Sequence, residues 1–371
     1  MTTLAKCIHA LLLAATVGFA AAAEPSPAPA AGIVRPAAEP AGRIVAGRLA
    51  ELMEKRYVFP DIGTRYAATL RGKAAAGEYD ALTGEDLGKR LLADLEATHP
   101  DAHLNVKPDL RPAEGSPAAG GDDGLEHVER HAPDMEEARW IAPGVAFVRY
   151  NLFPGSPANI QATEEFLDRH GDARAIVFDL RAHRGGGLGE TDAIFGRLVA
   201  EPTRLLTMAT RRSLVEVVGM PPTDNPRLRL VEGDPEYISL EHWALPAADR
   251  SRIKARVYVL TSGRTASAAE HFALAMKVTG LGTLVGAPTR GANHFGDFEA
   301  LTEGLVAFIP FGRTFDPKTG RDWERTGVAP DIVVAAEDAL ATVLEREGVD
   351  AAKARALADE LAPPALPRPG A

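Results

Sequence analysis

Short apolar runs of β-forming residues alternate with amphipathic helical patterns from residue 145 onward in this 371-residue chain. The apolar runs and the helical patterns that follow them are 145–152 with 160–169, 175–180 with 190–199, and 255–260 with 266–279. Regular strand–helix alternation is typical of a domain in which helices cover a mostly parallel sheet. We therefore predict an α/β layered core over residues 138–347.

Three further amphipathic helical patterns precede this core. The first begins at about Arg43, a break at Phe59-Pro60 separates it from a second that ends near Ala75, and the third covers residues 85–97. Their apolar positions recur at helical spacing. We predict a small N-terminal helical domain over residues 43–110.

Two less regular segments complete the predicted domain organisation. Residues 111–137 are polar and contain several Gly and Pro residues, which predicts an exposed loop. Residues 348–371 read as a C-terminal helix followed by a Pro-rich tail. No internal repeat is evident.

The N-terminus has the pattern of a secretory signal peptide over residues 1–23. Lys6 is its one charged residue, an apolar stretch follows, and small residues precede Glu24. A membrane anchor is the alternative, but the apolar run is short for a membrane span. Residues 24–42 are rich in Pro and Ala and read as a linker. We expect a periplasmic or secreted protein with no stable membrane anchor after signal cleavage.

Cysteine content and charge exclude several classes of function. The single cysteine, Cys7, lies in the predicted signal peptide, so the mature chain would have no disulfide, no thiolate nucleophile and no Cys-based zinc site. The formal net charge of −10 argues against a nucleic-acid partner, because phosphate neutralisation needs a basic surface.

The most specific local signal is the segment TSGRTASAAE at residues 261–270. It joins an apolar β run to a helical pattern through a tight turn, which places Ser267 beside the first free N–H groups of a helix. That position suits a nucleophile whose reaction develops negative charge. Ser267 and Glu270 also fit a capping box, in which both side chains serve only the helix end. The segment alone leaves both interpretations open.

Three distant segments contain the remaining candidate residues. They are His103, the glycine run 185–187 after an apolar strand, and Glu324 before the last apolar run. Taken alone, His103 fits a surface or core histidine, the glycine run fits a tight turn without phosphate-loop spacing, and Glu324 fits a solvated carboxylate. Together with Ser267 they supply a nucleophile, a base, a carboxylate and oxyanion donors, the set required for acyl transfer. The histidines show no metal-ligand spacing, and serine acylation needs no cofactor.

Four motifs in order resemble the tail-specific, or C-terminal processing, peptidase family. They are DLRAHRGG at 179–186, TSGRTASAAE at 261–270, VGAPTRG at 285–291 and GVAPD at 327–331. The resemblance, with the N-terminal helices, covers about residues 43–345. It implies a Clp protease/crotonase-like core of repeated ββα units.

This chain differs from the Ser–Lys branch of the family. Ala292 stands where those enzymes carry their lysine, and residues 111–137 are too short and polar for their PDZ domain. The chain resembles instead the branch of the tricorn core and the interphotoreceptor retinoid-binding protein repeats. That resemblance implies Ser267 as nucleophile, His103 as base and Glu324 as orienting carboxylate.

The resemblance also assigns an oxyanion hole and leaves a rival base. Its backbone donors would be Ala268 with Gly185 or Gly186. His294 lies just past the position of the missing lysine and is the rival base, or a substrate-pocket residue. Two further positions depart from the pattern: Ala102 replaces a serine of tricorn protease, and His183 replaces the asparagine of the D-L-R-x-N turn and is a second possible pocket residue.

The predicted function is that of an exported serine hydrolase, most simply a peptidase acting on peptide or protein substrates. The alternative is a non-catalytic carrier of hydrophobic ligands, of the retinoid or lipid type found among the retinoid-binding repeats. An acyl-coenzyme A enzyme of the related crotonase fold conflicts with export.

Overall fold

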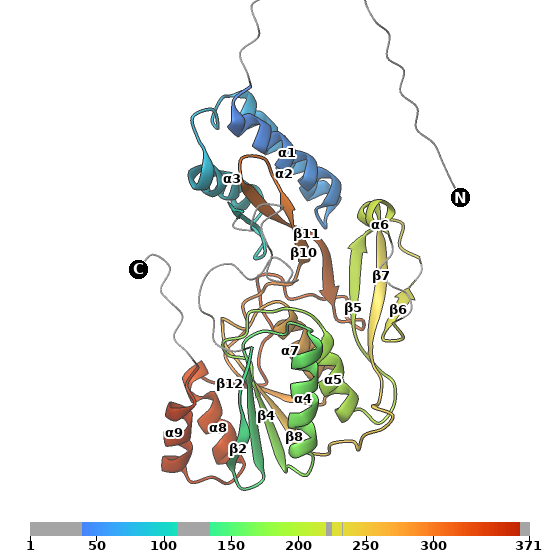
Figure 1. Cartoon of the computed structure of the whole chain (residues 1–371), viewed down its shortest axis with the longest axis vertical. Helices are drawn as coiled ribbons and strands as arrows, with labels where there is room; N and C mark the ends of the chain where they lie inside the picture. Colours follow the sequence, from blue (N-terminus) through green and yellow to red (C-terminus); the bar gives the residue numbers. More distant parts are fainter. Residues whose placement is uncertain (1–38, 110–133, 220–224, 232, 364–371) are drawn as a thin grey trace, which may run out of the picture. The chain divides into compact units, whose positions relative to one another are not determined.

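The computed structural model describes residues 39–109, 134–219, 225–231 and 233–363 (Figure 1). The predicted signal peptide, most of the linker, most of the polar loop and the Pro-rich tail lie outside these residues. Over the described ranges, no helix has the length and apolar character needed to cross a membrane. The described residues belong to one compact unit.

The three predicted N-terminal helices are confirmed as α1 (Ala41–Arg56), α2 (Pro60–Ala75) and α3 (Gly84–Thr98). Pro60 starts α2, where its fixed φ suits a helix and its missing N–H costs no hydrogen bond. Leu49, Met53 and Leu70 are fully buried between the helices. Their core also includes Leu305 and Ile309, so the helical domain packs against a strand of the second sheet.

The predicted α/β core contains a six-stranded sheet in the order β12-β9-β8-β4-β3-β2. The pairs from β3 to β12 are parallel and β2 pairs with β3 antiparallel. The strands are β2 (Met135–Ala142), β3 (Val145–Tyr150), β4 (Ala175–Asp179), β8 (Arg256–Thr261), β9 (Thr283–Gly286) and β12 (Ile332–Val333).

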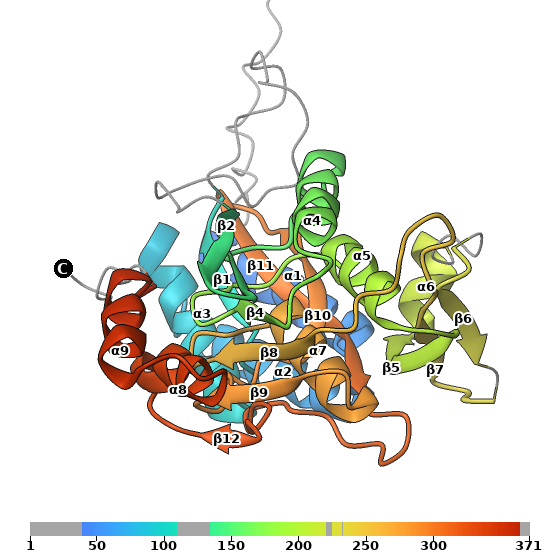
Figure 2. The ribbon, with the colours of Figure 1, turned by 90° about the horizontal axis from the view of Figure 1, so that it is seen from below.

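Helices cover both faces of this sheet. Phe166, Phe195 and Phe272 share a core with Ile176 and Phe178 on one face. These phenylalanines belong to α4 (Pro157–Arg169), α5 (Gly189–Leu198) and α7 (Ala268–Thr279). The alternate strand residues pack on the other face against α8 (Ala339–Arg346) and α9 (Ala351–Glu360). Figure 2 shows these two helices next to each other, on the other side of β4 and β8 from α5. Because both faces are buried, the strands read as continuous apolar runs.

A second, antiparallel sheet has the order β1-β11-β5-β7-β6, with β10 also paired to β11. Its strands are β1 (Asn105–Pro108), β5 (Thr203–Arg211), β6 (Leu228–Val231), β7 (Tyr237–Ala244), β10 (Phe295–Ala300) and β11 (Leu305–Phe315), and α6 (Arg212–Val218) follows β5. β1 carries the end of the helical domain directly into this sheet, with Asn105 opposite Phe308. β-forming runs near residues 205–210 and 305–310 of the sequence predict β5 and β11, whereas β1, β6, β7 and β10 were not predicted. It also placed residues 135–137 in a loop, whereas β2 begins at Met135.

Replacing Phe272 by Ala tests the packing of α7. Its ring is fully buried and lies 5.5–5.9 Å, centroid to centroid, from Phe153, Phe178 and Phe195. We expect F272A to lower the free energy of unfolding by about 3–5 kcal/mol, because it leaves a cavity among these rings. V333A, at a position that is 73% exposed, is the control. Equal losses in the two variants, measured by chemical denaturation, would contradict this packing.

Candidate functional site

Ser267 occupies a strained turn between β8 and α7. Its φ of 58° and ψ of −121° lie where residues with a Cβ are rare, so surrounding contacts must hold it there. Thr265 fixes the turn from inside, since its hydroxyl donates to the carbonyl of Leu180 at 2.8 Å and accepts the N–H of Ser262 at 3.0 Å. The turn is thereby tied to the end of β4.

The buried Glu270 carboxylate accepts four hydrogen bonds around this turn. One oxygen accepts the N–H groups of Ser267 at 2.9 Å and Ala292 at 2.8 Å. The other accepts the Thr289 hydroxyl and the Gly291 N–H, both at 2.6 Å. Burial raises the pKa of Glu270, and these donors act in the opposite direction. The carboxylate half of the predicted capping box is therefore present, and it also joins the serine turn to residues 289–292.

The glycine run lies directly against Ser267. Gly185 has a φ of +123°, and a Cβ added to it would lie 2.8 Å from the Cβ of Ser267 and 3.2 Å from its Oγ. A Cβ on Gly186 would lie 2.1 Å from the carbonyl oxygen of Phe153. Glycine is required at both positions for this close approach. The structure thus brings the predicted nucleophile and the predicted oxyanion turn into contact.

The backbone N–H groups beside Ser267 differ in whether they already have a hydrogen-bond acceptor. That of Gly185 donates to Nδ1 of His183 at 3.0 Å. Ala268 is the first residue of α7, where a backbone N–H has no acceptor within the helix. Ala268 therefore offers a donor beside Ser267, whereas the Gly185 donor already has an acceptor.

His183 is a buried support for the glycine run. Its ring is fully buried and lies edge-on to Phe153, with centroids 4.2 Å apart. Desolvation lowers its pKa to about 3, so the ring is neutral, and its Nδ1 accepts the N–H of Gly185. Full burial removes His183 from any surface of this conformation, which gives the substrate-pocket interpretation no support.

Asp101 joins the two candidate histidines, and sequence reasoning did not single it out. Its Oδ1 accepts the backbone N–H of His103 at 2.9 Å. Its Oδ2 accepts the hydroxyl of Tyr57 at 2.8 Å and lies 2.6 Å from Nδ1 of His294. Burial alone would raise the pKa of Asp101, but the hydrogen bond and charge of His294 outweigh it and lower the pKa. The D-x-H spacing of Asp101 and His103 was the available signal.

His103 and His294 have opposite electrostatic environments. His103 is partly exposed, its ring stacks on Phe308 with centroids 5.6 Å apart, and its buried Nδ1 has no hydrogen-bond partner within the described ranges. Desolvation lowers the pKa of His103 to about 4. His294 is only 2% exposed; desolvation acts to lower its pKa, but Asp101 and Glu324 raise it overall.

Glu324 connects the segments that carry the two histidines. One oxygen accepts the N–H of Ala102 and the other the N–H of Asn293, both at 2.8 Å. Desolvation and the nearby charge of Asp101 raise the pKa of Glu324. No hydrogen bond joins Glu324 to the His103 ring among the residues that the structure describes. Glu324 contacts the segment that carries His103 through the backbone N–H of Ala102.

Ligating atoms of Asp101, His103 and Glu324 lie within 4.8 Å of one another, a grouping of residue types that also bind metal ions. The four carboxylate oxygens already accept hydrogen bonds from the protein, as described above. The carboxylate oxygens therefore have protein donors without a cation, whereas the buried Nδ1 of His103 has no partner within the described ranges.

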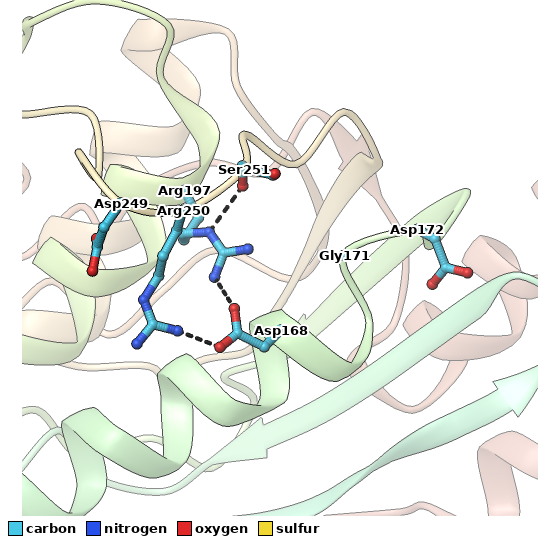
Figure 3. A pocket seen from close by; sticks show the side chains of 7 residues that line it. All are labelled: Asp168, Gly171, Asp172, Arg197, Asp249, Arg250 and Ser251. Atoms are coloured by element: carbon cyan, nitrogen blue, oxygen red, sulfur yellow. Dashed lines mark hydrogen bonds and ion pairs between the residues drawn. The ribbon is translucent and has the colours of Figure 1, made fainter.

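A polar pocket of about 530 Å³ lies elsewhere, around α4 and α5 (Figure 3). Its arginines are already engaged, since Arg197 donates to Asp168 at 2.6 Å and to the carbonyl of Ser251 at 3.1 Å, and Arg250 also binds Asp168. None of the predicted site residues lines it. The two arginines of this pocket are therefore already bound to protein groups.

Two protein-family models match this chain. The model of the family described as peptidase family S41 matches residues 144–334. The model described as the N-terminal domain of this family in eukaryotic interphotoreceptor retinoid-binding protein matches residues 40–142.

Solved structures share the fold at low sequence identity. A putative peptidase from Parabacteroides merdae is 18% identical, with 84% of this chain and 94% of that chain covered and a TM-score of 0.54. The photosystem II D1 C-terminal processing protease is also 18% identical, with 87% and 98% covered and a TM-score of 0.50.

Substituting Glu270 by Gln tests the role of its carboxylate in the serine turn. The amide presents N–H groups to backbone donors that need an acceptor, so we expect E270Q to lower the free energy of unfolding by about 3 kcal/mol. Chemical denaturation measures this, with the exposed Glu165→Gln as control. A loss no greater than that of E165Q would show that the four hydrogen bonds do not stabilise the turn.

Proposed function

Because the chain belongs to peptidase family S41, we propose that it is a serine peptidase that cleaves peptide bonds through an acyl-enzyme on Ser267. The observation that carries this proposal is the strained Ser267 turn, packed against Gly185 and held by Glu270. Strain of this kind concentrates at functional sites. A serine that only caps a helix has no need of a glycine run in contact with its side chain.

His103 is proposed as the base, as the sequence predicted. A general base must be neutral to accept a proton, and the low pKa of His103 keeps its ring neutral near pH 7. His103 is also partly exposed, whereas His294 is buried and more strongly protonated. Neighbouring titratable groups whose pKa values are pushed apart in this way commonly have different roles.

The proposed reaction follows the usual order of acyl transfer. The Ser267 hydroxyl oxygen bonds to the carbonyl carbon of the substrate while His103 takes the hydroxyl proton. His103 then gives this proton to the amine as the C–N bond breaks. Water, deprotonated by His103, hydrolyses the ester and restores the serine.

Backbone donors would stabilise the oxyanion. Ala268 and Gly186 are proposed for this role, because the N–H of Gly185 is bound to His183 in this conformation. A single donor of this kind contributes about 3–4 kcal/mol in comparable enzymes.

Glu324 and Asp101 are proposed to position His103 through the backbone N–H groups of Ala102 and His103. The signal-peptide pattern supports action outside the cytoplasm, which N-terminal sequencing of the mature protein would test.

Labelling by a fluorophosphonate tests the nucleophile and the base. We expect the mature chain to be labelled, S267A to lose labelling completely, and H103A to label about 10²–10⁴-fold more slowly because a general base is lost. Mass spectrometry of the labelled peptide locates the adduct. Labelling at Ser267 would also exclude a purely passive carrier of hydrophobic ligands.

The companion variant is H294A. Labelling at the full rate in H103A, combined with loss in H294A, would transfer the role of base to His294. Absence of labelling in the folded wild-type protein would overturn the proposed function.

The pH dependence separates the two histidines without mutation. The base must be neutral, and His103 becomes protonated only as the pH falls through about 4. We therefore expect the labelling rate to be maintained from pH 7 to pH 5 and to decline near pH 4. The raised pKa of His294 would instead place the decline above pH 6.5. Labelling reactions are stopped at fixed times and at constant ionic strength, and their rates locate the pH of the decline. Circular dichroism confirms folding at each pH.

A further inference from the structure

Three exposed arginines lie on the loops that meet at Ser267, and we call them the arginine rim: Arg184, Arg290 and Arg325. Arg184 directly precedes Gly185, which contacts the Ser267 side chain. The backbone N–H of Arg290 donates to the carbonyl of Thr265 at 2.9 Å, and that of Arg325 donates to the carbonyl of Gly291 at 2.7 Å. Each rim residue is therefore next to backbone that packs around the serine turn.

The guanidinium groups of the rim are available to a ligand. Within the described ranges, none of the three has a hydrogen bond to its side chain or a carboxylate within salt-bridge distance. Arginines elsewhere are commonly paired, such as Arg174 and Arg256, which both bind Glu347. Exposed guanidinium groups without a protein partner are free to bind carboxylates of another molecule.

The acidic groups near the rim are already engaged. Asp322 lies 3.2 Å from Arg313, and the Glu324 carboxylate accepts the N–H groups of Ala102 and Asn293. The charge of Arg290 also reaches the site, because it helps to lower the pKa of His103. Of the three rim arginines, Arg290 is therefore the one whose charge acts on His103.

The composition of the chain makes this clustering notable. There are 51 acidic and 41 basic side chains, so the chain as a whole repels acidic molecules. The arginine rim, in contrast to this net negative charge, is a local group of positive charges on three separate loops. Local positive charge in an acidic protein indicates selection of the ligand rather than general attraction.

We infer that the arginine rim binds carboxylate groups of the substrate, so that the peptidase prefers peptides with Asp or Glu close to the scissile bond. This inference rests on the proposed function of Ser267. It adds a class of substrate that the chemistry of acyl transfer alone does not specify.

The test uses fluorogenic peptides that differ only in having Glu, Gln or Lys on either side of the cleaved bond. We expect kcat/KM for the Glu peptides to exceed that for the Lys peptides by about tenfold at low salt and to approach it as ionic strength rises. Peptides with free and amidated C-termini identify the source of the carboxylate. A Glu preference that persists after amidation assigns the effect to the side chain, as inferred, and one that disappears assigns it to the terminus and overturns the preference for Asp or Glu side chains.

Charge reversal of the rim provides the matched variants. We expect R290E and the triple variant R184E/R290E/R325E to lose the preference for Glu and to gain one for Lys. R169E has the same charge change at the end of α4 that precedes β4, away from the serine turn, and should keep the wild-type preference. An uncharged fluorophosphonate reports whether Ser267 remains competent in each variant.

The outcomes separate this inference from the proposed function. Normal labelling of Ser267 with equal cleavage of Glu and Lys peptides, or an unchanged preference in a labelled triple variant, would overturn the inference alone. Absence of both labelling and cleavage in the wild-type protein would overturn the proposed function and this inference with it.

Discussion

The arrangement around Ser267 depends on one buried carboxylate. Glu270 accepts hydrogen bonds from Ser267, Thr289, Gly291 and Ala292, so a single side chain holds two loops that are distant in sequence. Thr289 extends the connection, because its hydroxyl oxygen also accepts the N–H of Val328 at 2.7 Å. A positive φ at Ser267 is unfavourable locally and persists because this network determines the position of the turn. Helix capping and site construction are therefore two consequences of the same carboxylate.

The N-terminal helical domain is part of the candidate site. It supplies Tyr57, Asp101 and His103, and its last strand, β1, pairs with β11. The Glu324 carboxylate, from the other end of the core, accepts the N–H of Ala102. The α/β core alone would lack both the proposed base and the aspartate that adjoins His294. The candidate site therefore contains residues from both the N-terminal helices and the α/β core.

Burial explains which parts of the fold could be predicted from the sequence. β3, β4 and β8 are buried on both faces and read as continuous apolar runs, and the helices that follow them bury regular apolar stripes. β6 is mostly exposed, the burial of β7 is mostly partial, and β10 is partly or fully exposed along its length. Their residues therefore show neither an apolar run nor a clean alternation. Only pairing with distant strands specifies them, and a local pattern does not contain that information.

The same limit applies to the candidate site. Ser267 and the glycine run could be identified because a strand–turn–helix junction is local, whereas Asp101 acquires its importance from contacts with residues 44 and 193 positions away. His103 and His294 are the same residue type, and no local pattern distinguishes their charge states. Desolvation dominates for His103, while a carboxylate at 2.6 Å overcomes desolvation for His294. Burial therefore lowers the pKa of His103, whereas the tertiary position of Asp101 raises the pKa of His294.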